Sequence, residues 1–269
     1  MKSFQAIATD LDGTLLRSDG TVSTRTRAAV MAAEDSGLRF VIATGRPPRW
    51  IAPIVEQLGE RGFVICANGA AVYDPAEHRL VSCIELKAEV VLSLVDEILD
   101  AFPDALLGCE QGFDFSLDES FKQKNQGLVG SWKLEGLRVG PIRSFLDRDV
   151  LKLIVRLPSP AAPGTADALQ AVVGDRALVT HSIDESFLEL SHPSVHKAAA
   201  IEQLLSQSGI SASQVVAFGD MPNDLEMIRW AGHGVAVANA DPMLKAAADE
   251  VTASNDEDGV AVVIERLLG

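Results

Sequence analysis

Short apolar runs that end in polar residues alternate with helix-like segments at the start of the chain. The apolar runs are residues 4–9, 38–43 and 63–67, each of a length that suits a buried strand. Between the first two runs, Ser23 is a typical helix N-cap and Gly37 a typical stop signal. Between the second and third runs, Pro47 and Pro48 suit the first turn of a helix that would run to about Leu58. Strands joined by helices in this order are typical of a parallel sheet with crossover connections. The alternation therefore predicts an α/β fold with a doubly wound, mainly parallel sheet.

The middle of the chain follows a different pattern, in which hairpin-like strand pairs are mixed with helices. The predicted segments are strands at 71–73, 80–83, 150–157, 177–183 and 187–190, and helices at 88–101 and 165–173. The stretch 111–140 has weak periodicity, and no defined element is predicted for it. A mixture of hairpins and helices is typical of an α+β unit, so we expect a separate domain here.

The last third of the chain returns to the first pattern. A helix at 196–206 precedes a buried strand at 215–218, and further short helices and strands follow. We therefore expect residues 1–83 and 189–269 to form one Rossmann-like core domain. An inserted α+β domain of residues 84–188 would interrupt it.

The composition is that of an ordinary globular protein with an acidic surface. Of the 269 residues, 47% are hydrophobic and 23% are charged, and the net charge is −15. An acidic surface disfavours nucleic acids, whose binding depends on Lys and Arg that neutralise phosphates, and it repels anionic membranes. A phosphorylated ligand would need a local positive centre, which a bound metal ion could supply.

The cysteines and the apolar runs indicate where such a protein resides. Cys66, Cys83 and Cys109 are odd in number and lack zinc-ligand spacing, so we expect reduced thiols. The sequence contains neither a signal-peptide pattern nor an apolar run close to the ~20 residues of a membrane span. We therefore expect a cytoplasmic protein that binds neither membrane nor nucleic acid. The oligomeric state stays open between monomer and homodimer.

Polar residues follow four of the predicted strands, at the end where each strand stops. In an open parallel sheet, ligands bind outside the carboxyl ends of the strands, so these residues would meet at one edge. A single Asp or Thr in such a position is often only a turn residue or a helix cap. Four such strand ends together indicate a functional site. The residues are Asp10 and Asp12, Thr44, Asn68, and Asp220, Asn223 and Asp224.

The first of these strand ends carries two carboxylates on either side of one apolar residue. Asp10 and Asp12 would lie close together, where mutual repulsion raises the proton affinity of one of them. One ionised carboxylate could then attack phosphorus while the other transfers a proton. Gly13 would let the backbone turn closely around a phosphate.

Two further segments could bind a phosphate group. The hydroxyl of Thr44 and the free N–H groups of Gly45 and Arg46 form a natural phosphate seat at a strand-to-helix turn, although alone this segment is more often a helix cap. Lys197 alone would be an ordinary exposed lysine. At this edge of the sheet it could neutralise the nucleophile and bind a phosphate oxygen.

The last strand end supplies carboxylates one helical turn apart. Asp220 and Asp224 could face one point, with Asn223 as a hydrogen-bonding neighbour. Carboxylate oxygens suit Mg²⁺, which takes one or two carboxylates together with water and phosphate oxygens. A capped helix start is the alternative interpretation of this segment taken alone.

The ordered set of motifs resembles the haloacid dehalogenase (HAD) superfamily of phosphotransferases. The resemblance rests on the segment from Asp10 to Leu15, on Thr44-Gly45-Arg46, on Lys197, and on Gly219-Asp220 with Asn223-Asp224. The late insertion is similar to that of the Cof-type branch of sugar-phosphate and related phosphatases, as are Asn68-Gly69-Ala70 and Asn255 before Asp258-Gly259-Val260.

The resemblance implies a Mg²⁺-dependent phosphatase that hydrolyses a small phosphorylated metabolite such as a sugar phosphate, nucleotide or cofactor phosphate. The inserted domain would be a cap that determines substrate specificity. The resemblance implies Asp10 as the nucleophile that becomes phosphorylated and Asp12 as the general acid and base. The implied phosphate-binding residues are Thr44, Gly45, Arg46, Lys197 and Asn223. The implied Mg²⁺ ligands are Asp10, Asp12 through its backbone carbonyl, Asp220 and Asp224.

Three alternatives remain open at this point. A phosphomutase or phosphotransferase of the same superfamily would pass the phosphoryl group to another hydroxyl instead of water. A non-catalytic protein that binds a phosphorylated ligand would keep the same residues. A receiver-like signalling module also combines a phospho-accepting Asp with a Thr and a Lys, but it has no use for a proton donor such as Asp12 or for an inserted domain.

Overall fold

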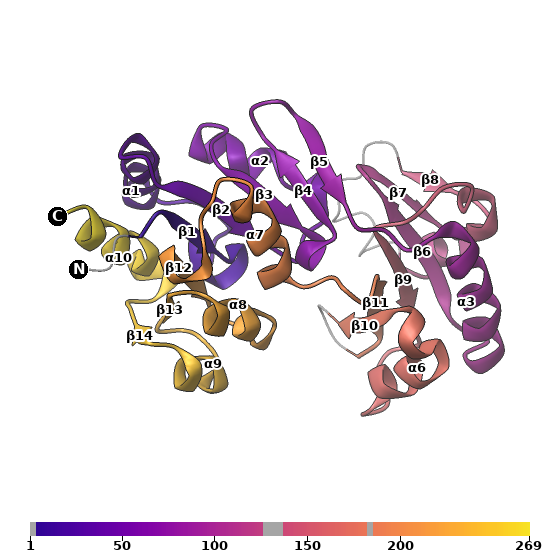
Figure 1. Cartoon of the computed structure of the whole chain (residues 1–269). Coiled ribbons are helices and arrows are strands. Elements are labelled where there is room, and N and C mark those ends of the chain that lie inside the picture. The colour runs from indigo at the N-terminus through magenta and orange to yellow at the C-terminus, as the bar shows by residue number, and fades with distance from the viewer. Residues whose placement is uncertain (1–3, 126–136, 182–184) are drawn as a thin grey trace. The chain divides into compact units, whose positions relative to one another are not determined.

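The computed structural model describes residues 4–125, 137–181 and 185–269, and the chain divides into two compact units (Figure 1). The first unit combines the two ends of the chain, Met1–Ser82 and His196–Gly269. The second is the contiguous segment Cys83–Val195. The boundary expected between residues 188 and 189 falls inside a strand of the second unit, so the second unit extends further than expected.

The first unit is built on an eight-stranded sheet with strand order β14-β13-β12-β1-β2-β3-β4-β5. The pairs from β14 to β3 are parallel, and β4 runs antiparallel to β3. The strands are β1 (Ala6–Thr9), β2 (Arg39–Ala43), β3 (Phe63–Cys66), β4 (Ala71–Asp74), β5 (Arg79–Cys83), β12 (Val215–Gly219), β13 (His233–Ala236) and β14 (Glu250–Val251). The mainly parallel α/β sheet predicted from the sequence is confirmed.

Helices cover both faces of this sheet. On one face, α7 (Lys197–Ser206), α8 (Leu225–Trp230) and α9 (Pro242–Ala247) pack on a core that includes Ala8 and Ala217. The helices α1 (Thr24–Asp35) and α10 (Gly259–Leu268) contact each other, and α1 packs against β2 (Figure 1). The helical crossovers follow from parallel pairing, because consecutive parallel strands cannot be joined by a tight turn.

A helix cap and a proline explain where two helical segments of this unit begin or break. The Ser23 hydroxyl accepts a hydrogen bond from the Thr26 N–H (2.9 Å) and so caps α1 as expected. The single helix predicted after Pro48 is wrong: the structure has only α2 (Ala52–Val55), with a 3₁₀ turn on each side. Pro53 lies inside this segment and has no N–H to donate, so a continuous helical ladder is not available.

The second unit contains a six-stranded sheet with strand order β10-β11-β9-β6-β7-β8. All pairs described are antiparallel except β7 with β8. The strands are β6 (Leu106–Gln111), β7 (Asp114–Leu117), β8 (Arg138–Val139), β9 (Lys152–Arg156), β10 (Leu178–His181) and β11 (Phe187–Ser191). The helices are α3 (Ala88–Ala101), α4 (Glu119–Lys124) and α6 (Thr165–Val173).

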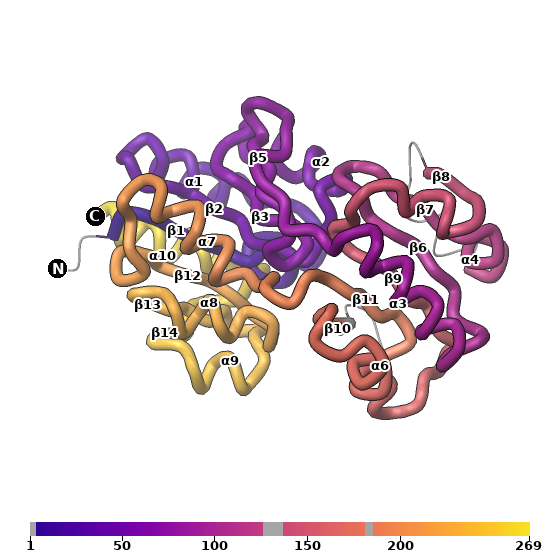
Figure 2. Tube along the Cα trace, turned by 45° about the vertical axis from the view of Figure 1, so that its right-hand side comes forward, coloured from indigo at the N-terminus to yellow at the C-terminus, as the bar shows by residue number. Residues whose placement is uncertain are grey.

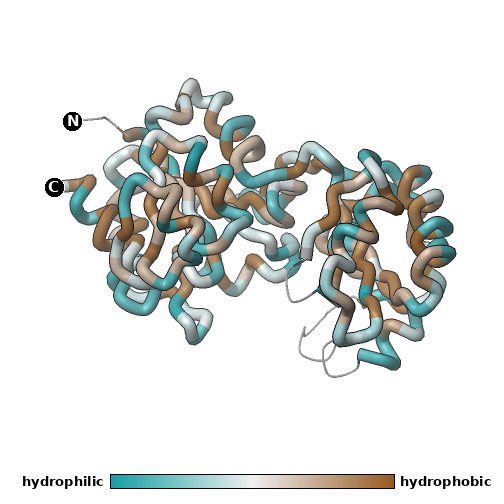
Figure 3. Tube along the Cα trace, turned by 90° about the horizontal axis from the view of Figure 1, so that it is seen from below, coloured by the Kyte–Doolittle hydropathy of each residue, from teal (hydrophilic) through white to brown (hydrophobic). Residues whose placement is uncertain are grey.

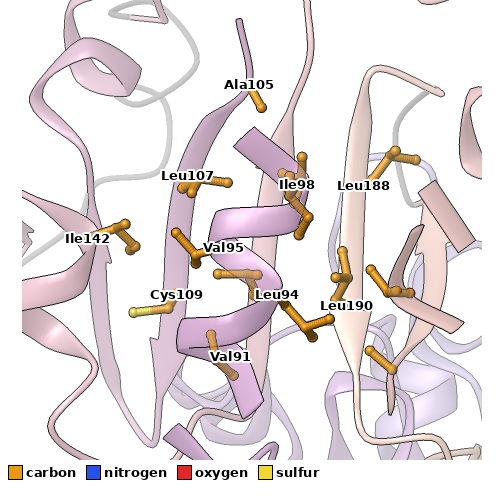
Figure 4. Close-up of a cluster of buried hydrophobic side chains, with 14 of the residues drawn as sticks. Val91, Leu94, Val95, Ile98, Ala105, Leu107, Cys109, Ile142, Leu188 and Leu190 are labelled. Carbon is orange, nitrogen blue, oxygen red and sulfur yellow. The ribbon is translucent and has the colours of Figure 1, made fainter. Parts of the chain in front are cut away.

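One face of this second sheet is covered by α3 and α6. Figure 2 shows α3 running alongside β6 and β9 of this sheet. Val91, Leu94, Val95 and Ile98 of α3 point onto the strands, as the spacing of an amphipathic helix requires (Figure 4). A smaller apolar cluster that includes Phe121 of α4 covers part of the other face. Hydrophobic stretches lie inside each unit, and hydrophilic stretches lie mainly on the surrounding helices and loops (Figure 3).

The weakly periodic stretch of the sequence contains regular structure after all. It begins with the end of β6 and continues through β7 and α4, with Gly112 (φ +64°) in the turn between the two strands. Periodicity missed β6 because all six of its residues are buried, the polar Glu110 and Gln111 included. Residues 126–136 of this stretch, and residues 182–184 at the end of a predicted strand, lie outside the described residues. Within the described ranges, no helix is long and apolar enough to cross a membrane.

Candidate active site

The polar residues predicted at the strand ends lie along one edge of the first sheet. Asp220 follows β12, Asp10 follows β1, Thr44 follows β2 and Asn68 follows β3. These four strands are consecutive neighbours in the sheet and run in parallel. The carboxyl ends of the strands therefore bring residues from distant parts of the sequence to a common edge, as the sequence predicted.

Three buried carboxylates form the centre of this edge. Asp10, Asp220 and Asp224 each offer an oxygen atom, and these atoms lie within 4.8 Å of one another. The ammonium group of Lys197, at the start of α7, contacts two of the three. Its Nζ lies 2.5 Å from Asp10 Oδ1 and 2.7 Å from Asp224 Oδ1, and the Lys197 side chain is only 1% exposed.

Backbone geometry fixes the carboxylates in place. Asp224 Oδ2 accepts hydrogen bonds from the N–H groups of Asp220 and Met221, both at 3.1 Å. Gly219 leaves the room that this turn needs, since a Cβ there would lie 2.6 Å from the Cβ of Asp224. Gly13 has a positive φ of +77°, and a Cβ at this position would lie 2.4 Å from Asp220 Oδ2.

The charges of the cluster do not balance. One ammonium group faces three carboxylates, so the cluster has an excess of two negative charges when all three carboxylates are ionised. Burial raises the pKa of Asp10 well above its ordinary value; Lys197 opposes this shift and the charge of Asp224 adds to it. Burial, together with the charge of Asp224, raises the pKa of Asp220 to about 6, although the Thr14 hydroxyl opposes this shift. Burial alone would lower the pKa of Lys197, but the two carboxylates outweigh it and raise that pKa.

Asp12 lies apart from the buried cluster and has a different partner. Its side chain is 54% exposed and forms a two-pronged ion pair with Arg46, whose side chain is 31% exposed. Arg46 Nε donates to Asp12 Oδ2 at 2.8 Å and Nη2 donates to Oδ1 at 2.5 Å. The carboxylate of Asp12 thus lies outside the buried cluster and is paired with Arg46.

The remaining predicted phosphate-binding residues lie around this centre. The Thr44 hydroxyl is buried and accepts a hydrogen bond from the Arg46 N–H (3.1 Å). Gly45 packs closely against Asn68, whose Oδ1 would lie 3.3 Å from a Cβ at residue 45. Asn223 is exposed on the turn before α8, and its side chain makes none of the hydrogen bonds found among the described residues of the cluster.

Thr14 and Asn239, to which the sequence analysis assigned no role of their own, support the same edge. The Thr14 hydroxyl donates to Asp220 Oδ1 at 2.9 Å. Asn239 Nδ2 donates to the carbonyl of Gly13 at 2.8 Å, and Asn239 Oδ1 accepts from the N–H of Asn255 at 3.0 Å. Asn239 follows β13 by three residues, so the strand-end rule that found Asp220 could have found it too.

The doubly wound sheet makes this an α/β protein, and a buried lysine with three carboxylates lies at the carboxyl edge of that sheet. The family model for haloacid dehalogenase-like hydrolases matches residues 7–264, and the chain belongs to this family. The family and the hydrolase class predicted from the sequence are therefore confirmed.

Relatives that cover nearly the whole chain are named as phosphatases. The 5-amino-6-(5-phospho-D-ribitylamino)uracil phosphatase YitU of Bacillus subtilis is 30% identical over 261 residues, which cover 95% of this chain and 94% of the relative. The phosphoglycolate phosphatase of Methanothermobacter thermautotrophicus is 30% identical and covers 98% of this chain and 99% of its own length. A haloacid dehalogenase-like hydrolase from Bacteroides thetaiotaomicron, known from its crystal structure, has a TM-score of 0.84 at 28% identity, covering 98% of this chain and all of its own. These names support the predicted enzyme class, a phosphatase.

Proposed function

We propose that this protein is a Mg²⁺-dependent phosphatase that hydrolyses small phosphorylated metabolites through a phosphorylated Asp10. The observation that carries the proposal is the buried contact of Asp10 with Lys197 beside two further carboxylates. A buried carboxylate next to an ammonium group can act as a nucleophile, because the ammonium group stabilises negative charge where a phosphoryl group would arrive. The free thiols of the cysteines agree with a cytoplasmic location.

The donor set at this edge fits a divalent cation. The three buried carboxylates are hard oxygen ligands of the kind that Mg²⁺ prefers. Their two excess negative charges match the charge of a divalent cation. Asp10, Asp220 and Asp224 would hold the ion by their side chains, with the backbone carbonyl of Asp12 as a further proposed ligand. When bound, Mg²⁺ would neutralise charge on the phosphoryl oxygens.

The proposed first step transfers the phosphoryl group to the protein. A carboxylate oxygen of Asp10 attacks phosphorus, and the bond from phosphorus to the ester oxygen breaks as the new bond forms. Asp12 gives a proton to the departing oxygen, so the product leaves as a neutral alcohol. Lys197 and the hydroxyl of Thr44 hold the phosphoryl oxygens, with Gly45 and Asn223 as supporting residues around them.

The proposed second step releases phosphate. Asp12, now a carboxylate, accepts a proton from a water molecule while the water oxygen attacks the phosphorus on Asp10. The bond between phosphorus and the Asp10 oxygen breaks, and the free Asp10 carboxylate pairs again with Lys197. Asp12 is thereby protonated and ready for the next substrate.

The substrate class rests on the relatives and on the inserted unit. YitU is named for 5-amino-6-(5-phospho-D-ribitylamino)uracil and the Methanothermobacter thermautotrophicus relative for phosphoglycolate, both small phosphorylated molecules. We propose a substrate of the same kind, a sugar phosphate, a nucleotide or a cofactor phosphate. The second unit, Cys83–Val195, would act as the cap that selects among them.

Hydrolysis of p-nitrophenyl phosphate tests the proposal. We expect turnover in Mg²⁺ that EDTA removes, and a loss of at least about 10³-fold in kcat for Asp10→Asn, because the nucleophile itself is removed. Asp100→Asn is the matched control, since Asp100 is exposed on α3 of the other unit. Product analysis in the presence of added sugars or alcohols separates hydrolysis from transfer to another hydroxyl.

A panel of phosphorylated metabolites extends the same experiment. It should include 5-amino-6-(5-phospho-D-ribitylamino)uracil and phosphoglycolate, the substrates after which the relatives are named. If folded protein in Mg²⁺ turns over neither the aryl ester nor any metabolite above background, the phosphatase proposal is wrong, and a non-catalytic binding role becomes the better explanation.

A further inference from the structure

We infer that Arg46 is a positioning residue for Asp12 and does not act mainly as a phosphate ligand. The inference rests on the proposed function, because it assigns a role within that reaction. The carrying observation is the paired contact of the Arg46 guanidinium with both oxygens of the Asp12 carboxylate, at 2.8 and 2.5 Å.

The geometry of this contact is specific to arginine. Two parallel N–H groups of the planar guanidinium meet the two oxygens of one carboxylate, which fixes the plane of the carboxylate as well as its distance. Such a pair adds little to stability when it is exposed, and the two side chains here are 31% and 54% exposed. Its effect is therefore on the direction of the Asp12 side chain more than on the free energy of unfolding.

Arg46 itself is held by the neighbouring strand ends. Its N–H donates to the Thr44 hydroxyl at 3.1 Å, and its carbonyl accepts from the N–H of Ala67 at 2.9 Å. The Asn68 N–H in turn donates to the carbonyl of Thr44 at 2.9 Å. The backbone of Arg46 is thus tied to the ends of β2 and β3, and through its side chain it ties Asp12, after β1, to the same frame.

The Asp12 side chain has no such frame of its own. It lies on the turn that begins at Asp10 and contains Gly13 at φ +77°, and more than half of it is exposed. Without a partner it could adopt several rotamers, and only those that face the ester oxygen allow proton transfer. One hydrogen bond to Arg46 can persist while the other oxygen of Asp12 carries the proton, so the guanidinium orients the carboxyl group through both steps.

The dependence of the rate on the leaving group tests this inference. In p-nitrophenyl phosphate the leaving group departs as a stable anion and needs no proton, whereas an alkyl phosphate needs one from Asp12. We expect Arg46→Met to lower kcat/KM about 10–100-fold for the alkyl ester, as part of the roughly 10²–10⁴-fold that general acid catalysis supplies, and to leave the aryl ester nearly unchanged. Arg46→Lys should restore little, because lysine cannot form the two-pronged contact.

A double variant and a control complete the experiment. Asp12→Asn with Arg46→Met should be no slower on the alkyl ester than Asp12→Asn alone, because Arg46 acts through Asp12. Arg27→Met, an exposed arginine on α1, should change neither ester.

Three results would overturn the inference. Equal losses on both esters with a raised KM would show that Arg46 binds the phosphate, and additive losses in the double variant would show that it acts independently of Asp12. Absence of any Mg²⁺-dependent turnover in the unmodified protein would instead refute the proposed function, and this inference with it.

Discussion

The ammonium group of Lys197 lies 2.5 Å from the carboxylate of Asp10, across 187 residues of sequence. Both side chains are almost fully buried, so each stabilises the charge of the other at a position that water does not reach. Asp224 provides the second carboxylate of the contact, at 2.7 Å. The pairing therefore links the start of the chain to its last third at the point where the chemistry is proposed to occur.

Removing the ammonium group should cost both stability and activity. For Lys197→Met we expect the free energy of unfolding without metal to fall by about 3–5 kcal/mol, because buried carboxylates lose their only cation in the cluster. Mg²⁺ should then raise the melting temperature more in the variant than in the unmodified protein. Urea unfolding and thermal melts with and without Mg²⁺ measure both effects. Lys122→Met, on an exposed site of α4, is the control, and an equal response of the two variants would contradict the expectation.

A single added methyl group should disturb the proposed metal site. In Gly219→Ala the new Cβ would lie 2.6 Å from the Cβ of Asp224, so Asp224 would have to move from its contacts. We expect a loss of about 1–3 kcal/mol in the free energy of unfolding and a weaker affinity for Mg²⁺, measured by urea unfolding and calorimetric titration. In the control Gly140→Ala the nearest atom is at 3.3 Å, on the end of the Phe145 ring, so unchanged Mg²⁺ binding is expected there. Normal Mg²⁺ affinity in Gly219→Ala would show that Asp224 is not a ligand.

The stabilisation by Mg²⁺ should depend on pH. Burial raises the pKa of Asp220 from 3.8 to about 6, so the folded protein binds this proton more tightly than the unfolded chain does. The stability that this group contributes without metal is therefore present below pH 3.8 and lost as the pH rises through about 6. A proton on Asp220 competes with the metal, so the rise in melting temperature on adding Mg²⁺ should be small at pH 5 and large at pH 7.5. Melts at both values measure it.

Asp220→Asn is the matched variant for this pH dependence. It keeps the shape of the side chain but removes the titrating group, so the Mg²⁺-induced change in melting temperature should become smaller and depend less on pH. A pH dependence identical to that of the unmodified protein would assign the effect to another group of the cluster, such as Asp10.

A cavity in the core of the second unit should lower stability without changing Mg²⁺ binding at the proposed site in the first unit. Leu94 of α3 is fully buried against the sheet (Figure 4), so Leu94→Ala should lower the free energy of unfolding by about 2–5 kcal/mol. The control is Leu92→Ala on the same helix, where the side chain is only partly buried and the loss should be smaller. Urea unfolding measures both, and Mg²⁺ affinity should not change in either variant. Equal losses would contradict the packing in Figure 4.

Strong local patterns allowed much of the fold to be predicted. The bounds predicted for α3 and α6 agree with the structure because both helices have a marked apolar stripe that faces one sheet. The helix predicted across Pro53 was wrong because the missing N–H outweighed the apolar spacing. The strand β6 was missed because Glu110 and Gln111 are buried with their apolar neighbours, and periodicity cannot show such burial.

The positions of the candidate site residues could be predicted, but the contacts of their side chains could not. The strand-end rule places Asp10, Thr44 and Asp220 at one edge, and the order of the parallel strands in the structure agrees. The rule does not give side-chain directions, so it could not show that Arg46 pairs with Asp12 or that Thr14 bonds to Asp220. The catalytic roles of Asp10 and Asp12 stay predictions until the variants are measured.

The order of strands in the first unit has a consequence for the protein while it is being made. The central strand β1 pairs with β2 on one side and with β12 on the other, and β12 is synthesised more than 200 residues later. A nascent chain would therefore carry one unpaired edge of β1, which other chains or chaperones can bind, until Val215–Gly219 leaves the ribosome. The contiguous second unit ends at Val195, so its whole sequence is synthesised before β12 begins at Val215. A product of interrupted synthesis that ends before Lys197 would keep Asp10 but lack its partner, so incomplete chains would have no working site with which to attack the cell's phosphate esters.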